Sequence, residues 1–220
     1  MRQIFIGLIT EGTTDNRFLE SIAKRTFEEI GFDCNGDLEI FVTTLSINKT
    51  NLGFVDYVLH ASKYGLEEFG ISVLCVHADA DDIDDTNAYT YKIIPATQIL
   101  NNLDEDKYCT LLTPLIPVQM IESWMLADKE LLKKEIGTTR SDIDLGLNRI
   151  PEQVRDPKAL IENAIRVSME HLPKRRRNLN IGELYQPLGQ KISLVKLDEL
   201  DSFKKFKEEI RRTYRTLNYM

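Results

Sequence analysis

Three short apolar segments, each followed by a segment with helical spacing, constrain the fold of this chain most strongly. They are residues 3–9 (QIFIGLI), 38–44 (LEIFVTT) and 71–79 (ISVLCVHAD), which contain few polar residues. Strands of this kind are buried on both faces, as in parallel sheets whose crossover connections are helices. We therefore predict a βαβαβ arrangement in which helices cover both faces of a parallel sheet.

The segments between these strands have the apolar spacing of amphipathic helices. After Thr13, Thr14 or Asp15, each of which can cap a helix, apolar residues recur every three or four positions from Phe18 to Ile30. The same spacing predicts further helices at residues 52–69, 87–103, 117–136, 157–171 and 202–217.

A fourth strand and a C-terminal helical region complete the predicted architecture. Residues 109–116 form a strand whose Pro114 predicts an edge position or an early end, because proline cannot donate a ladder hydrogen bond. Residues 137–157 are polar and turn-rich, so we expect a loop there. We predict an α/β core over residues 1–136, with a parallel sheet of about four strands flanked by helices. Residues 137–220 are predicted to form a loop plus a helical elaboration packed on this core.

The composition is that of a globular cytoplasmic protein. The chain has 220 residues, of which 42% are hydrophobic and 29% are charged, and this is enough apolar material for a core. No apolar run approaches the roughly 18 residues of a membrane span, so no membrane partner is expected. Cys34, Cys75 and Cys109 lie far apart without the spacing of a zinc site, which predicts free thiols in a reducing cytoplasm.

Charge is distributed unevenly along the chain. The net charge of −7 argues against a uniformly basic nucleic-acid surface. Residues 171–220, however, hold 12 lysines and arginines against 6 acidic residues, whereas residues 1–170 hold 16 against 29. This distribution fits a protein that holds a metal ion in its acidic part and a polyanion near its basic end. Solvated charged helices give the same pattern and are the simpler explanation.

Carboxylates follow the first and third predicted strands. Glu11 comes after the first strand, and Asp79 and Asp81 come at the end of the third. Because ligands of a parallel α/β sheet collect beyond the carboxyl ends of the strands, these side chains are expected to meet. Their charges would repel without a cation, and oxygen ligands without sulfur favour Mg²⁺ or Mn²⁺. The acidic run lacks the glycine and the glutamate of a calcium-binding loop.

The neighbouring polar residues have simpler interpretations. The remaining acids of the two turns are interpreted as turn formers or helix caps: Asp15, Asp82, Asp84 and Asp85. His77 shares a strand face with Asp79, and a packed strand histidine is favoured over a ligand or a residue supporting one.

Two of these motifs resemble the Toprim domain of topoisomerases, primases and related nucleases. The first is a Glu-Gly pair in a strand-to-helix turn, LITEGTTDNRFL, and the second is an apolar strand ending in DxD, ISVLCVHADAD. A third segment, IPVQMIESWMLAD, is similar to a helix of stand-alone bacterial Toprim-like proteins of unknown function. These proteins are related to Toprim nucleases of the overcoming-lysogenisation-defect type. They also share a DPK motif and a closing LGxxIxL segment, which stand here at residues 156–158 and 188–194.

The resemblance implies a Toprim-like, Rossmann-like fold and a role for each residue of the site. Glu11 would be a general acid or base, or would share a metal with Asp79 and Asp81, which would hold Mg²⁺ or Mn²⁺. Glu122 is a candidate for a further catalytic acid, and a solvent-facing helix residue is the alternative. Trp124 is expected in the core or an interface rather than as a platform for base stacking.

Basic residues in the C-terminal half are candidates for contacts with nucleic-acid phosphates. They are Lys158, Arg175, Arg176, Arg177 and Lys191. A basic run in a loop is more often a solvated surface, which is the alternative for the three arginines.

Three functional hypotheses follow. The first is a metal-dependent nuclease that hydrolyses DNA or RNA, in a bacterial anti-phage or mobile-element defence system with an ATPase partner. The second is a non-catalytic interaction or regulatory subunit of such a system. The third is a small-molecule phosphohydrolase, against which the chain has neither a glycine-rich phosphate loop nor a DxDxT motif, since Ile83 takes the last position. The sequence leaves open whether the chain forms a homo-oligomer.

Overall fold

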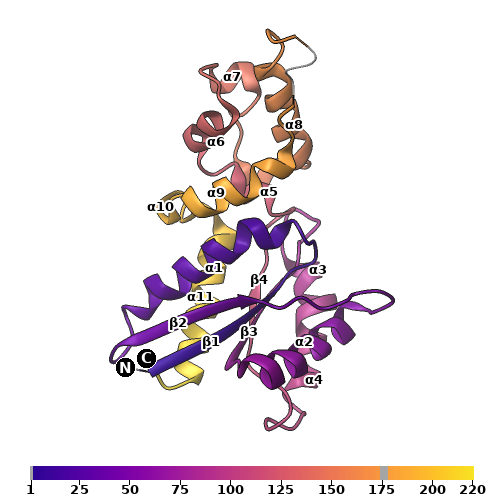
Figure 1. Ribbon diagram of the computed structural model, residues 1–220, viewed down its shortest axis with the longest axis vertical. Helices are drawn as coiled ribbons and strands as arrows, with labels where there is room; N and C mark the ends of the chain where they lie inside the picture. The colour runs from indigo at the N-terminus through magenta and orange to yellow at the C-terminus, as the bar shows by residue number, and fades with distance from the viewer. Residues whose placement is uncertain (1, 174–177) are drawn as a thin grey trace.

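A computed structural model describes residues 2–173 and 178–220 and has an α/β fold (Figure 1). Its centre is a four-stranded sheet in the order β2-β1-β3-β4, with every neighbouring pair parallel. The strands are β1 (Arg2–Ile9), β2 (Leu38–Thr44), β3 (Val73–His77) and β4 (Leu112–Leu115). The predicted α/β class, with a parallel sheet flanked by helices, is therefore confirmed.

The register places the two most apolar strands in the middle of the sheet. β1 pairs with β2 from Arg2 opposite Leu38 onward, and β3 pairs with β1 on one side and β4 on the other. All five residues of β3 are buried. β4 is an edge strand, as Pro114 predicted: it pairs with β3 alone, so its free edge tolerates a residue without an N–H group.

Helices cover both faces of the sheet. α1 (Asp15–Gly31) and α11 (Asp201–Thr216) lie on one face, and α2 (Phe54–Phe69) and α4 (Ile94–Leu100) lie on the other (Figure 1). α11 is fixed by polar contacts inside this apolar layer. The hydroxyl groups of Thr113 and Thr213 lie 2.6 Å apart, and the Tyr214 hydroxyl donates to the carbonyl oxygen of Phe27 at 2.9 Å. These buried polar groups therefore have the partners that burial requires.

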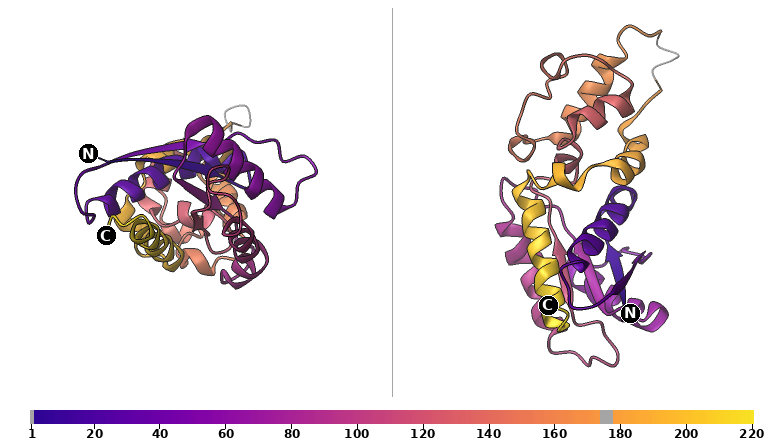
Figure 2. Two further views of the ribbon diagram at one scale, coloured as in Figure 1. Left: turned by 90° about the horizontal axis from the view of Figure 1, so that it is seen from below. Right: turned by 90° about the vertical axis from the view of Figure 1, so that its left-hand side faces the viewer.

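A group of helices lies beyond the carboxyl ends of the strands, and α11 returns from it along the sheet (Figure 2). These helices are α5 (Glu122–Met125), α6 (Lys129–Ile136), α7 (Asp142–Leu145), α8 (Pro157–Ser168), α9 (Tyr185–Lys191) and α10 (Leu194–Leu197). One hydrophobic cluster joins them to the sheet, with Trp124 fully buried against Phe203 and Phe206. The Trp124 Nε1–H donates to Ser202 Oγ at 2.7 Å, so this tryptophan belongs to the core, as predicted.

The contact between α9 and α1 is unusually close. A Cβ atom at Gly189 would lie 2.3 Å from the carbonyl oxygen of Phe18, so only glycine fits at this crossing. Arg25 of α1 fixes the crossing from the side, donating to the carbonyl oxygens of Gly189 and Ile192, each at 2.7 Å. The backbone of α9 is therefore held directly against that of α1.

The structure corrects the predicted helices in three places. No helix opens at Pro117, because residues 115–119 pair with residues 78–82 through backbone hydrogen bonds. The helix predicted at 87–103 consists of α3 (Thr86–Ala88), a π-helical turn (Tyr89–Ile93) and α4. The Thr14 side chain does not cap α1, although Thr14 is its N-cap residue.

The region predicted as a loop contains short helical turns. Residues 137–157 contain α7, which begins with a capping box between Ser141 and Asp144, and a short 3₁₀ turn (Pro151–Gln153). Within the described residues, no helix is both long enough and apolar enough to cross a bilayer.

Candidate metal centre

The candidate site lies where the connections of the two central strands diverge. The chain leaving β1 continues into α1 on one face of the sheet, whereas the chain leaving β3 continues into α3 and α4 on the other. Such a switch point opens a crevice at the carboxyl ends of the strands, where α/β proteins bind ligands. Glu11 and Asp15 follow β1, His77 ends β3, and Asp79 and Asp81 follow it. Both groups therefore lie at the carboxyl edge of the sheet.

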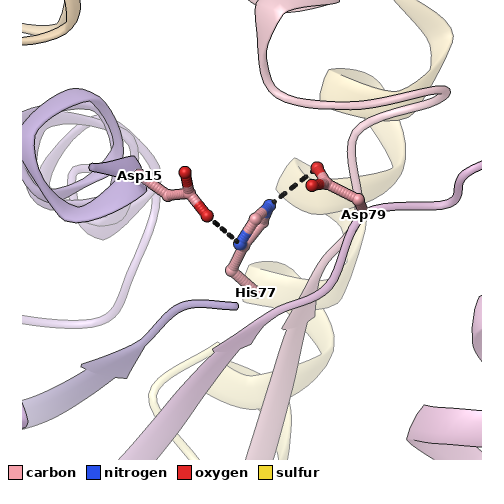
Figure 3. Close-up of side chains that lie close together, drawn as sticks. All are labelled: Asp15, His77 and Asp79. Carbon is pink, nitrogen blue, oxygen red and sulfur yellow. Dashed lines mark hydrogen bonds and ion pairs between the residues drawn. The ribbon is translucent and has the colours of Figure 1, made fainter. Parts of the chain in front are cut away.

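A histidine lies between two carboxylates at the centre of the site (Figure 3). His77 Nε2 is 3.2 Å from Asp79 Oδ1, and His77 Nδ1 is 3.7 Å from Asp15 Oδ2. One ligand atom from each of these three residues lies within 4.8 Å of the others, which is compact enough for a metal ion. The imidazole is only 1% exposed, so its position is fixed by the surrounding core.

The hydrogen bonds of His77 favour one tautomer. The backbone N–H of Glu11 donates to Nδ1 over 3.4 Å, so Nε2 carries the proton and donates it to Asp79 Oδ1. The backbone N–H of Ile121 donates to the same oxygen at 3.1 Å. In this tautomer His77 supports Asp79 rather than binding a metal itself, as residues behind metal ligands commonly do.

The Asp15 carboxylate makes two kinds of contact, one within its own turn and one with His77. Its Oδ2 accepts a hydrogen bond from the Gly12 N–H at 2.6 Å, which stabilises the turn between β1 and α1. The same carboxylate faces His77 and belongs to the compact cluster with Asp79. The interpretation of Asp15 as a turn former is therefore correct but incomplete.

The backbone that carries Asp81 is held in an uncommon conformation. Asp81 and Gln119 both have positive φ angles, 54° and 61°, in the left-handed region. The Asp81 N–H donates to the Gln119 carbonyl at 2.8 Å, and the Gln119 N–H donates to the Asp82 carbonyl at 3.0 Å. Non-glycine residues in this region are uncommon and often mark functional sites. The exposed Asp81 side chain lies with its Oδ2 3.9 Å from the Lys92 ammonium.

Two lysines approach the acidic residues. Lys92 Nζ lies 2.6 Å from Glu11 Oε1 and 3.9 Å from Asp81 Oδ2, and it donates to the carbonyl oxygen of Asp79 at 3.2 Å. Lys49 Nζ donates instead to the carbonyl oxygens of Thr10 and, at 2.6 Å, Glu11. Lys49 also lies 4.3 Å from the centre of the Tyr57 ring, and burial lowers its pKa.

Glu122 is buried at the start of α5, which overturns its interpretation as a solvent-facing residue. Only 5% of it is exposed, and its Oε1 accepts a hydrogen bond from the hydroxyl group of Tyr185 on α9. Burial raises the pKa of Glu122, and the charge of Asp79 adds to this effect, whereas Lys158 opposes it. Burial and Glu122 together raise the pKa of the Tyr185 hydroxyl.

Because the pKa of Glu122 is raised, we predict that ionisation of this residue lowers the free energy of unfolding as the pH rises. Because the folded protein holds this proton more tightly than the unfolded chain does, the contribution of Glu122 to the free energy of unfolding falls as the pH rises above the ordinary carboxyl pKa. We expect Glu122→Gln, whose amide does not titrate, to gain melting temperature relative to the unaltered protein as the pH rises above about 4, near the ordinary glutamate pKa. Thermal unfolding at several pH values measures this difference. A difference that is constant, or that grows toward acid, contradicts the assignment.

The structure brings together most of the predicted site residues, in two groups. Glu11 and Asp81 share the Lys92 ammonium, whereas the Asp79 carboxylate turns toward His77 and the start of α5. Glu122 lies close enough to Asp79 for their charges to interact. Asp82 and Asp84 accept hydrogen bonds from local backbone N–H groups, as expected of turn formers. Asp85 binds Lys205 of α11 at 2.8 Å.

The two predicted phosphate-binding lysines that the structure describes interact with different acidic residues. Lys158 is exposed in the first turn of α8 and interacts with Glu122, and Lys191 is paired with Glu135 of α6 at 2.8 Å. Arg175, Arg176 and Arg177 lie outside the described residues. Nucleic-acid binding by this set stays a prediction.

Sequence reasoning missed three residues that the fold brings to the site: Asp15, Lys92 and Tyr185. The spacing of Glu11 and Asp15, four apart across a strand-to-helix turn, was a usable signal for the first. The other two come from helices far along the chain, and their residue types carry no local signal.

The fold and the site together define the class of protein: a parallel α/β protein with a carboxylate cluster at its topological switch point. The donor set fits a hard divalent cation, because it offers aspartate and glutamate oxygens and no thiolate. The Lys92 ammonium already occupies a cationic position beside Glu11 and Asp81. Comparison of this chain with family models, with curated proteins and with solved structures gave no match.

Proposed function

We propose that this protein is a Mg²⁺- or Mn²⁺-dependent nuclease that hydrolyses phosphodiester bonds of DNA or RNA. The observation that carries the proposal is the convergence of carboxylates from three separate segments at the carboxyl end of the sheet. Glu11 and Asp15 come from one turn, Asp79 and Asp81 from the second, and Glu122 from the start of α5. Acidic residues concentrated in this way are characteristic of sites that bind divalent ions and phosphates.

The residues suited to hold the metal are Asp79, Asp15, Glu11 and Asp81. A bound divalent cation would polarise the phosphodiester and stabilise the negative charge that develops on its oxygens. Asp79 Oδ1 is fixed by Ile121 and His77, and no hydrogen bond to its Oδ2 is found within residues 2–173 and 178–220. Oδ2 is therefore the oxygen that Asp79 offers to a ligand.

Glu122 is suited to move a proton at this site. Its raised pKa keeps a proton on the carboxyl group at a higher pH than a solvated glutamate would. The Tyr185 hydroxyl group fixes Oε1, which leaves the other carboxyl oxygen as the proton donor to a leaving oxygen. The place of the protein in a defence system with an ATPase partner is supported by the Toprim resemblance alone.

Cleavage assays with purified protein test the proposal. We expect nicking of supercoiled plasmid, or cutting of single-stranded DNA or RNA, that requires Mn²⁺ or Mg²⁺, stops with EDTA and falls at least about tenfold in Glu11→Gln. Equal cleavage by the two proteins would mean that the activity does not come from this site.

A non-catalytic regulatory subunit is the second candidate function. It is favoured by the internal partners of the site, because Lys92 neutralises Glu11 while His77 and Ile121 engage Oδ1 of Asp79. Metal binding measured by calorimetry without cleavage of any of the three substrates would support this candidate over the first.

A further inference from the structure

Lys92 places a positive charge beside two carboxylates that the proposed function assigns to a metal. Its Nζ lies 2.6 Å from Glu11 Oε1 and 3.9 Å from Asp81 Oδ2. It also donates to the carbonyl oxygen of Asp79 at 3.2 Å, so the ammonium is surrounded by oxygens from the turns after β1 and β3. An ammonium has three N–H donors and no acceptor, and it therefore meets the same kind of oxygen atoms that a hard cation requires.

The local backbone holds this lysine in place. Lys92 belongs to the π-helical turn Tyr89–Ile93, a rare form of helix that occurs frequently at functional sites. Its ammonium lies 5.8 Å from the centre of the Phe54 ring, and its side chain is 26% exposed, whereas that of Asp81 is 68% exposed. The Lys92 ammonium therefore lies beside the Phe54 ring, and the more exposed Asp81 side chain approaches it from the solvent side.

The ammonium and a divalent ion cannot use the same oxygens at once. A Mg²⁺ ion binds oxygen at about 2.1 Å, and the lone pairs that would bind it on Glu11 include those that face Lys92. Positive charges this close also repel strongly in a partly buried site. A metal that binds Glu11 through Oε1 must therefore displace the Lys92 ammonium.

We propose that the Lys92 side chain acts as an internal counter-ion. In the absence of metal it neutralises the carboxylates of Glu11 and Asp81, and when metal is present it competes with the metal for these carboxylates. This inference rests on the proposed function, because it takes these carboxylates as metal ligands. Its consequence is that Lys92 raises the metal concentration at which the site fills, while keeping the carboxylates close together when the metal is scarce.

Lys49 provides a matched control. It also carries an ammonium close to Glu11, but this ammonium binds the carbonyl oxygens of Thr10 and Glu11 and lies over the Tyr57 ring. Loss of Lys49 removes the same charge from the neighbourhood without freeing a carboxylate. Comparison of the two lysines therefore separates competition for the ligands from a general electrostatic effect.

Isothermal titration calorimetry with Mn²⁺ alone tests the proposal on the full chain. We expect Lys92→Met to bind Mn²⁺ about tenfold more tightly than the unaltered protein, because no ammonium has to leave. Lys92→Arg, which keeps the charge, should stay within about threefold of the unaltered protein. Lys49→Met should not tighten binding by more than about threefold. Lys92→Gln replaces Lys92→Met if the latter does not fold.

The possible outcomes distinguish this proposal from the proposed function. If the unaltered protein binds Mn²⁺ and Lys92→Met binds it equally or more weakly, the counter-ion proposal is wrong and the metal site stands. If Lys49→Met tightens binding as much as Lys92→Met does, the effect is general and the proposal is also wrong. If no variant binds Mn²⁺, both proposals fail. Thermal unfolding gives a second measure, since Mn²⁺ should raise the melting temperature of Lys92→Met more than that of the unaltered protein.

Discussion

Asp79→Asn is expected to reduce metal-dependent cleavage by more than about 100-fold, the upper end of the effect seen for residues that merely support a metal ligand. Both hydrogen bonds to Asp79, from Ile121 and His77, go to Oδ1, and an asparagine keeps this oxygen. The substitution changes the other oxygen to an NH₂ group and removes the negative charge. The fold should therefore survive while the metal ligand is lost.

Cleavage rates and Mn²⁺ binding, measured side by side, check this expectation. Asp37→Asn makes the same chemical change just before β2, at the opposite edge of the sheet, and should leave both quantities unchanged. An Asp79→Asn protein that still binds Mn²⁺ and cleaves at the original rate would remove Asp79 from the site.

The largest effect on stability is expected from Gly189→Ala. Alanine is the better helix former by about 1 kcal/mol, so the intrinsic preference of α9 favours the substitution. The new Cβ atom, however, would lie 2.3 Å from the Phe18 carbonyl oxygen and 2.7 Å from its Cα atom, and backbone atoms cannot move aside as a flexible side chain can. We expect the free energy of unfolding to fall by about 3 kcal/mol.

Equilibrium unfolding in urea measures this change. Gln190→Ala introduces the same residue at the next position of α9, which is exposed, and should change the free energy of unfolding by less than about 0.5 kcal/mol. Equal stability of the two variants would show that α9 and α1 are not held as closely as the crossing at Gly189 implies.

The strands of the sheet could be predicted from sequence because they are short runs of mostly apolar residues. Residues 3–9 and 38–44 are mostly apolar, and the structure has β1 and β2 within one residue of these limits. The expectation of burial on both faces is wrong for β2, an edge strand in which only Ile40 is buried. The error at Pro117 has a different origin. Residues 117–119 are predicted as the start of a helix, but their backbone groups bond to residues 80–82, some 37 positions earlier, and no local pattern reports such a partner.

The candidate site was predictable only in part, for the same reason. The rule that ligands gather beyond the carboxyl ends of parallel strands identified Glu11 and Asp79 from their positions alone. It could not show that Asp79 turns toward His77 while Glu11 turns toward Lys92. Tyr185 reaches Glu122 because α9 packs against α1, and this depends on a contact between residues more than 160 positions apart.

The return of α11 to the sheet has a consequence for the synthesis of the protein. α11 contributes Tyr214 to the core beside α1, and its Lys205 binds Asp85 at the end of the loop that carries Asp79 and Asp81. A nascent chain in which α11 is still inside the ribosome holds every carboxylate of the site but lacks the layer that fixes them. The candidate site would therefore reach its final geometry only once residues 201–216 have packed against the sheet.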